Sequence, residues 1–193
     1  SITFVGAGVI NLVYCIKHNK NLKFPIWMVV ALTCAMLGDI FLVLNFYLGT
    51  AVFAVGHIFY FVSYCMLEKM NRRDWICGIS ISIIALSIIL FAPFLDFGGV
   101  LMQGVCCTYA MIISFMVGKA ISNLLKENNH VNIIIVVGSI LFFISDLMLV
   151  LDLFGDIPVA SYLCLGTYYP AQFLLAFSLF VYAGINSSNK LEG

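Results

Sequence analysis

The sequence predicts an all-α membrane protein, a bundle of about seven transmembrane helices. Hydrophobic residues make up 63% of the 193-residue chain and charged residues only 9%, with a mean hydropathy of +1.11. A soluble domain needs many more charges to keep its surface hydrated. Because one transmembrane helix takes about 20 apolar residues, the chain has room for seven or eight spans and almost no extramembrane domain. Any catalysis or transport must therefore take place within the bundle.

Seven apolar stretches mark the expected spans, separated by breaks that carry Lys, Asn, Gly and Pro. They cover residues 2–16, 25–45, 48–67, 75–94, 98–118, 131–151 and 159–185. We expect residues 1–185 to form a single transmembrane domain. The polar tail at 186–193 follows, and its Leu191-Glu192-Gly193 end is typical of a cloning remnant. The first stretch is short and has no basic segment before it, so we expect no cleaved signal peptide.

The basic residues lie on alternate connections between these spans. Lysine and arginine follow spans one, three, five and seven, while the other connections hold Asp96, Asp152 and Asp156 and no lysine or arginine. All nine cations therefore fall on one face of the bundle: Lys17, Lys20, Lys23, Lys69, Arg72, Arg73, Lys119, Lys126 and Lys190. Only an odd number of spans keeps this segregation, which favours seven spans over eight. The positive-inside rule then predicts a cytoplasmic C-terminus.

The ends of the second and sixth spans resemble each other. Residues 38–45 read GDIFLVLN and residues 145–152 read SDLMLVLD, so that Asp, Leu, Val and Leu coincide. Each of these spans is followed by one with an aromatic and polar cluster. A parallel duplication, with three helices on either side of a linking fourth, would explain the match. It would place a site between two halves related by a pseudo-twofold axis along the membrane normal.

Asp39 and Asp146 are the candidate catalytic groups, because no other acidic residue lies inside a predicted span. Each lies 16 positions after a residue on the basic side, Lys23 and His130 respectively. At 1.5 Å per residue, both lie about 24 Å from that side and so at equal depth. Acidic side chains in a membrane interior are costly and are functional candidates by default. With no lysine or arginine inside a span, desolvation and repulsion are expected to keep one acid protonated near neutral pH.

Polar side chains on the third and seventh spans accompany the two acids. His57 is the only histidine within a span, and with Tyr60 and Tyr64 it forms a stripe on one helix face. On the seventh span, Gln172 shares a face with one of two adjacent tyrosines, residues 168 and 169. Its amide would be costly to leave unpaired in lipid. These side chains are candidates to orient the acids or to bind a substrate.

Metal, nucleotide and nucleic-acid chemistry are not expected. A zinc site usually takes three or four ligands including several His or Cys, and the spans offer one histidine. The seven cysteines lie mostly in apolar runs, form no C-x-x-C motif and are typical of small buried hydrophobic residues. The chain also has no nucleophile elbow, phosphate-binding loop or nucleic-acid-binding surface. We therefore expect no cofactor, no metal and no nucleic-acid partner.

Four short motifs occur in order along residues 30–180, each on a different span. They are Leu37-Gly38-Asp39 with Leu42, Gly56-His57 with Tyr60, Gly138-Ser139 with Ser145-Asp146, and Thr167-Tyr168-Tyr169 with Gln172. In this order the motifs resemble the YhhN-like lysoplasmalogenase family of polytopic membrane proteins. That family usually has eight spans, one more than the sequence predicts here.

The resemblance implies a hydrolase that cleaves the vinyl-ether bond of lysoplasmalogens, releasing a fatty aldehyde and a glycerophospho-alcohol. A lysophospholipid substrate and membrane lipid are then the expected partners. Vinyl-ether hydrolysis needs a general acid and a carboxylate, which are the roles we assign to Asp39 and Asp146 in either order. His57 joins them as a catalytic candidate. The residues expected to bind substrate or orient the acids are Tyr60, Ser145, Tyr168, Tyr169 and Gln172.

Two other functional classes stay open at this point. Intramembrane carboxylates and parallel triple-helix repeats suit a small-molecule or proton-coupled transporter equally well. In a scaffold protein, the two acids would only fix contacts between helices. Aldehyde release from purified protein in detergent separates the hydrolase from both, because transport needs two compartments.

Overall fold

The computed structural model describes residues 1–18 and 21–188, with side chains up to residue 184. Within these ranges the chain forms seven α-helices and no strand. The helices are α1 (Ile2–Lys17), α2 (Lys23–Leu44), α3 (Phe46–Leu67), α4 (Arg72–Phe91), α5 (Val100–Lys126), α6 (His130–Gly155) and α7 (Pro158–Ser188). Residues 186–188, predicted to belong to the polar tail, are therefore the last residues of α7. The rest of the predicted tail lies outside the described residues.

Six described helices are long and apolar enough to cross a membrane, and α1 is shorter at 16 residues. The chain is thus an all-α, multi-pass integral membrane protein, as predicted. The helix ends agree with the predicted spans within three residues, except at the ends of α5 and α6.

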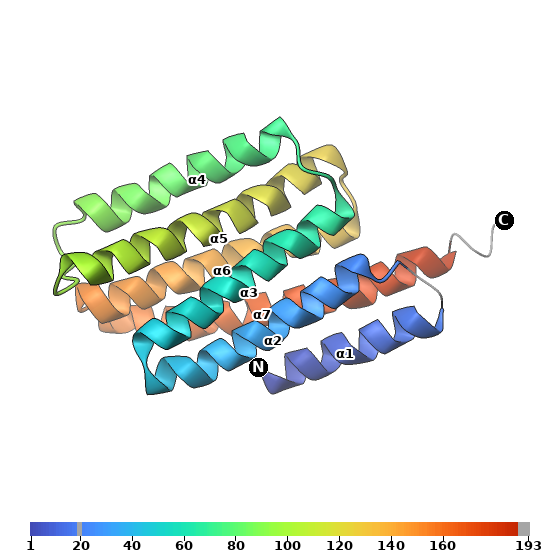
Figure 1. The fold of residues 1–193 in the computed structure, drawn as a ribbon, viewed down its shortest axis with the longest axis horizontal. Helices are drawn as coiled ribbons and strands as arrows, with labels where there is room; N and C mark the ends of the chain where they lie inside the picture. Colours follow the sequence, from blue (N-terminus) through green and yellow to red (C-terminus); the bar gives the residue numbers. More distant parts are fainter. Residues whose placement is uncertain (19–20, 189–193) are drawn as a thin grey trace.

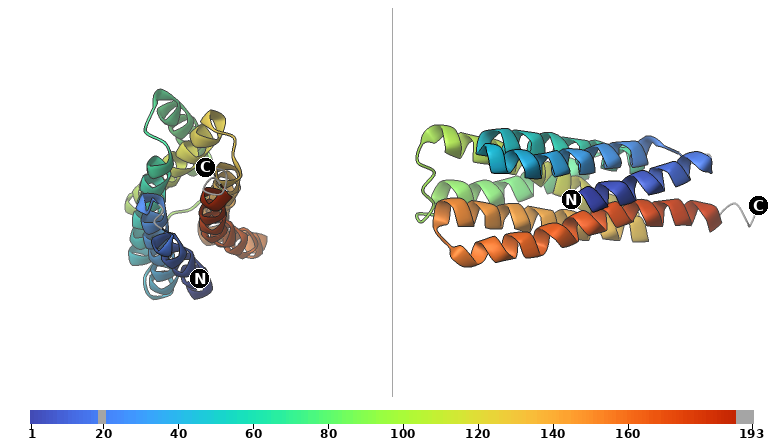
Figure 2. Two further views of the ribbon diagram at one scale, coloured as in Figure 1. Left: turned by 90° about the vertical axis from the view of Figure 1, so that its right-hand side faces the viewer. Right: turned by 90° about the horizontal axis from the view of Figure 1, so that it is seen from below.

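The helices form a ring with one helix outside it. Backbone contacts run in the order α1, α2, α3, α5, α6, α7 and back to α1, while α4 contacts only α5 among the described helices. The end-on view in Figure 2 shows α4 at the edge of the bundle, beside α5. The triplets α1–α2–α3 and α5–α6–α7 therefore follow each other around the ring in the same sense. A parallel duplication would produce this arrangement, and the duplication itself stays a prediction.

The two ends of the bundle differ in charge. The helices α1, α3, α5 and α7 finish at one end, and α2, α4 and α6 finish at the other (Figure 1). We call the first the basic end, because the described lysines and arginines lie at or near it, and the second the acidic end, after Asp96, Asp152 and Asp156. Lys20 and Lys190 lie outside the described residues. The cytoplasmic location of the basic end stays a prediction.

The predicted end of the fifth span at residue 118 is wrong. Helix α5 continues to Lys126, and Lys119 lies within it with a fully buried side chain. Its ammonium contacts a carboxylate oxygen of Asp74 at 3.0 Å and donates to the carbonyl of Lys69 at 3.2 Å. Because the buried cation is paired, the helix can carry it without an isolated charge. Lys119 is therefore a cation inside a helix, but its partner is Asp74 and not either candidate acid.

Two glycines allow this ion pair to form. A Cβ added at Gly118 on α5 would lie 2.5 Å from the backbone nitrogen of Gly78 on α4. Only residues without a side chain permit two helix backbones to approach so closely. Asp74 lies in the first turn of α4, where its carboxylate also accepts the backbone N–H of Asn71 in a capping box.

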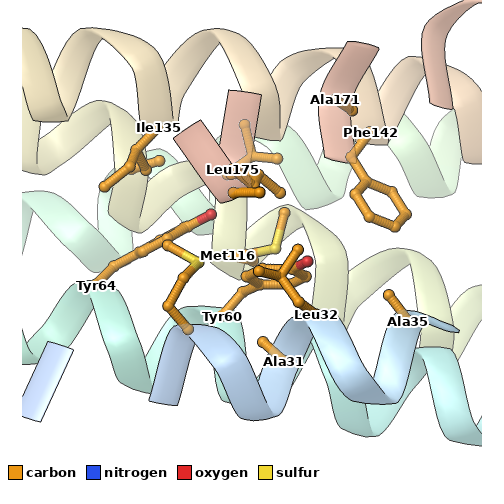
Figure 3. Close-up of a cluster of buried hydrophobic side chains, with 14 of the residues drawn as sticks. Ala31, Leu32, Ala35, Tyr60, Tyr64, Met116, Ile135, Phe142, Ala171 and Leu175 are labelled. Atoms are coloured by element: carbon orange, nitrogen blue, oxygen red, sulfur yellow. The ribbon is translucent and has the colours of Figure 1, made fainter. Parts of the chain in front are cut away.

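A buried core fills the bundle towards the basic end. Figure 3 shows aromatic and aliphatic side chains from α2, α3, α5, α6 and α7 converging on one another. The labelled core residues include Leu32, Tyr60, Tyr64, Met116, Ile135, Phe142 and Leu175, each fully or almost fully buried. Tyr64 pairs with the hydroxyl of Ser139 at 2.9 Å, so its buried hydroxyl is satisfied.

Candidate active site

A cavity of about 640 Å³ lies in the half of the bundle towards the acidic end. Side chains from all seven helices line it, and most of them are apolar. Among the described lining residues, Asp39 and Asp146 carry the only charged side chains. Each acid lies 16 residues after the first residue of its helix, Lys23 in α2 and His130 in α6. The fold therefore brings two carboxylates at matching helix positions to one apolar cavity.

Asp39 is bound by side chains from α7 and by Ser1. The hydroxyl of Tyr168 donates to one carboxylate oxygen at 2.6 Å, and the hydroxyl of Ser1 donates to the other. Gln172 lies one helical turn after Tyr168, and its amide N–H donates to the tyrosine oxygen at 3.1 Å. The amide oxygen of Gln172 accepts from Tyr60 at 3.4 Å. The hydrogen bonds thus run from Tyr60 towards Asp39, which is the final acceptor.

Asp146 is bound by a second chain of donors. The hydroxyl of Tyr109 on α5 donates to Asp146 Oδ2 at 2.6 Å. His57 Nε2 lies 2.8 Å from the Tyr109 oxygen and 3.3 Å from the same carboxylate oxygen. Because the single hydroxyl hydrogen of Tyr109 is donated to Asp146, its oxygen is available to accept from His57 Nε2. The other ring nitrogen of His57 faces the sulfur of Met116 at 3.3 Å.

A buried phenylalanine separates the two chains of hydrogen bonds. The ring of Phe142 contacts His57 at 4.7 Å and Tyr168 at 5.3 Å between centroids, both edge to face. Among the described residues no hydrogen bond joins Asp39 directly to Asp146. Each acid therefore has its own phenol donor, and both keep access to the cavity.

The comparisons with known proteins agree with the order of the sequence motifs. A model of the YhhN family matches residues 2–179, nearly the whole chain. The chain belongs to the YhhN family. This confirms the family resemblance drawn from the four motifs. No solved structure matches the chain.

The predicted site residues of this YhhN-family protein fall into two groups. Asp39, Ser145, Asp146, Tyr168 and Tyr169 line the cavity. The remaining three, His57, Tyr60 and Gln172, are buried behind it and reach the acids through Tyr109 and Tyr168.

The two adjacent tyrosines of α7 have different positions. Tyr168 bonds to Asp39 and Gln172, whereas Tyr169 is 48% exposed at the rim and stacks edge to face against Tyr168. Tyr168 is therefore the tyrosine that shares a face with Gln172. Ser145 is buried, and its hydroxyl donates to the backbone carbonyl of Cys164 at 3.1 Å.

Tyr109 is the main site residue of the YhhN-family protein that sequence reasoning did not find. It is the only tyrosine in the fifth predicted span, but no acid, amide or histidine lies near it at helical spacing. Its partners come from α3 and α6, so only the packing of three helices reveals its role. Among the described residues no group of three or more His, Cys, Asp or Glu side chains is arranged to hold a metal ion.

Proposed function

We propose that this protein is an intramembrane hydrolase that cleaves the vinyl-ether bond of lysoplasmalogens. The YhhN family includes lysoplasmalogenases. One observation supports the proposal most strongly: two carboxylates from α2 and α6 line the same apolar cavity within a membrane-spanning bundle. Largely apolar cavities with a few convergent polar groups are the usual form of small-molecule sites. Such a cavity suits a lipid that carries one reactive polar bond.

The reaction is the addition of water to a vinyl ether, R–CH=CH–O–R′. A general acid first gives its proton to the carbon remote from the oxygen, and the adjacent carbon becomes part of an oxocarbenium ion. The carboxylate stabilises this cation and takes a proton from the attacking water, which forms a hemiacetal. The hemiacetal hydroxyl then returns its proton to the first acid. The second acid protonates the departing oxygen, so that R–CH2–CHO and HO–R′ are released and both acids regain their starting states.

The hydrogen bonds favour one assignment of the two roles. Both oxygens of Asp39 accept hydrogen bonds, from Tyr168 and Ser1, which suits a carboxylate that stabilises the cation. Asp146 uses Oδ2 for Tyr109 and His57, and its Oδ1 has no hydrogen-bond partner among the described residues. A proton on that oxygen is free to be transferred to substrate. We therefore assign Asp146 as the acid and Asp39 as the carboxylate.

Replacing either acid tests the proposal. Purified Asp39→Asn and Asp146→Asn variants should each lose aldehyde release by about a hundredfold or more, since positioned acids and bases contribute roughly 10²–10⁴-fold. Asp156→Asn is the matched control, because Asp156 is exposed, lies outside the cavity and has a left-handed backbone that asparagine tolerates. Thermal unfolding in detergent reports whether each variant is folded. Wild-type aldehyde release by either folded cavity variant would refute the assignment.

A transporter is the second candidate, and the ring of two helix triplets favours it. Parallel repeats with a site between them are common in transporters. The purified protein in detergent separates the two functions, because only the hydrolase releases aldehyde without a second compartment.

A further inference from the structure

The cavity has an exposed rim and a buried lobe. The rim is formed by side chains of α2, α6 and α7 that are each about half exposed or more: Ile40, Val43, Leu153, Leu165 and Tyr169. The cavity is also lined by buried residues of α4 and α5, of which the most exposed, Ala110, is only 6% exposed. We call this part the deep lobe, lined by Ala85, Ile89, Cys106, Ala110 and Ile113.

The deep lobe is apolar and covered at the acidic end. None of its five lining side chains carries a charge. The partly buried rings of Phe143 and Phe154 pack against the cluster that four of them form, Ala85, Ile89, Cys106 and Ala110. The connection between α4 and α5 is attached to α6, since the backbone N–H of Asp96 donates to the carbonyl of Phe154 at 2.8 Å. The ring of Phe97 also contacts Phe154, with centroids 4.7 Å apart. A molecule in the deep lobe is therefore surrounded by hydrocarbon.

The two acids lie between the rim and the deep lobe. Asp39 extends from α2 and is bound by Tyr168 of α7, two of the helices that form the rim. Asp146 is bound by Tyr109, which is the residue before Ala110 on α5. An elongated molecule that entered from the rim would thus pass Asp39 and Asp146 before it reached the deep lobe.

We propose that the deep lobe binds the alkyl chain of a single-chain lipid, and that Ala85 and Ala110 limit the chain length that fits. This inference rests on the proposed function for the identity of the lipid. The reverse orientation would place a phosphate in a lobe that offers it no cation and only the weak S–H donor of Cys106, and burying an unpaired charge is very costly. The headgroup therefore lies on the rim side, with the reactive bond beside the acids.

Alanine is well suited to such a limit because its side chain leaves space that a larger residue would fill. In an apolar pocket, one methylene group changes discrimination between substrates by about 10–200-fold. Leucine in place of Ala85 or Ala110 would occupy part of the lobe and exclude the terminal carbons of a long chain. Shorter chains would still reach the acids.

Chain-length selectivity tests the proposal directly. In Ala85→Leu and Ala110→Leu, kcat/KM for an eighteen-carbon lysoplasmalogen should fall at least about tenfold relative to a twelve-carbon one. Ala51→Leu is the matched control, because Ala51 is exposed on α3 and does not line the cavity. Its ratio should equal that of the wild type. An unchanged ratio in both folded lobe variants would overturn the proposal.

A variant that enlarges the lobe keeps the proposal testable if the leucine variants do not fold. Ile89→Val removes one methylene from the lobe wall, which costs little stability, and should raise the relative rate on a twenty-carbon chain. If neither leucine variant folds and Ile89→Val leaves the relative rates on chains of different length unchanged, the proposal is wrong.

A binding measurement separates this proposal from the hydrolase assignment. Saturated lysophospholipids of twelve and eighteen carbons, which have no vinyl ether, should raise the thermal unfolding temperature of the wild type. The rise with eighteen carbons should shrink in the lobe variants and stay intact in Ala51→Leu. This result with no aldehyde release would refute only the hydrolase. Equal rises in all variants would refute the lobe assignment even if aldehyde is released.

Discussion

Tyr109 connects His57 to Asp146 by hydrogen bonds. Its hydroxyl donates to Asp146, and its oxygen lies within hydrogen-bond distance of His57. Through this hydroxyl, His57 and Asp146 Oδ2 belong to one hydrogen-bonded unit. Tyr109 also fixes which carboxylate oxygen is occupied, and the other oxygen has no hydrogen-bond partner among the described residues.

The conservative variant Tyr109→Phe tests this positioning role. It removes the donor to Asp146 and the acceptor for His57 while keeping the ring, so we expect kcat to fall about tenfold to a hundredfold with little change in KM. His57→Gln should have a similar effect, and the double variant should lose little more than either single one, because the residues act as a unit. Steady-state aldehyde release measures all three. Full additivity of the losses would contradict a shared hydrogen-bonded unit.

At the residue scale the sequence predicts the acids better than their partners. Asp39, Asp146, His57 and Gln172 are conspicuous because a charge or an amide in an apolar span is costly and therefore informative. A tyrosine carries no such signal, since its ring commonly packs among hydrophobic side chains. Tyr109 becomes a site residue only through contacts with two other helices, and sequence spacing within one helix does not reveal those contacts.

At the scale of elements, the pair of α4 and α5 is held by a buried ion pair and a close backbone contact. Lys119 is 0% exposed and Asp74 is 2% exposed. The two glycines at 78 and 118 let the helices approach closely enough for the charges to meet. Because α5 is the only described helix whose backbone lies beside that of α4, this pairing helps to keep α4 in place beside the deep lobe.

Breaking the ion pair should destabilise the protein strongly. We expect Lys119→Met to cost about 3–5 kcal/mol, because Asp74 would remain as an unpaired buried charge. The double variant Lys119→Met with Asp74→Asn should recover much of that loss. Thermal or denaturant unfolding in detergent measures both. Equal stability of wild type and Lys119→Met would show that the pair is not a structural element.

The element boundaries show where sequence reasoning succeeds and where it fails. Hydropathy places most helix ends well, since loop residues are polar and spans are not. It ends the fifth span at residue 118 because Lys119 looks like an interfacial charge. The helix continues to Lys126, and the buried Lys119 pairs with Asp74, which lies 45 positions earlier in the sequence. A long-range pairing of this kind lies beyond a reading of local composition.

At the scale of the whole molecule, the interior of the helix ring has two parts, a packed core and a cavity. The half towards the basic end is a packed core, and the half towards the acidic end encloses the cavity. His57, Tyr60 and Gln172 are buried beside the packed half, and their hydrogen bonds lead to the acids through Tyr109 and Tyr168. The cavity half leaves room for a lipid beside both carboxylates.

Hydrolysis in heavy water tests the central claim most directly. Purified wild-type protein in detergent and D2O should convert a lysoplasmalogen to an aldehyde with one deuterium on the carbon next to the carbonyl, because the acid must protonate that carbon. Asp39→Asn and Asp146→Asn should form almost none of this labelled product, while Asp156→Asn should match the wild type. Aldehyde without deuterium at that carbon, or a wild-type yield from either folded cavity variant, would contradict the two-carboxylate mechanism.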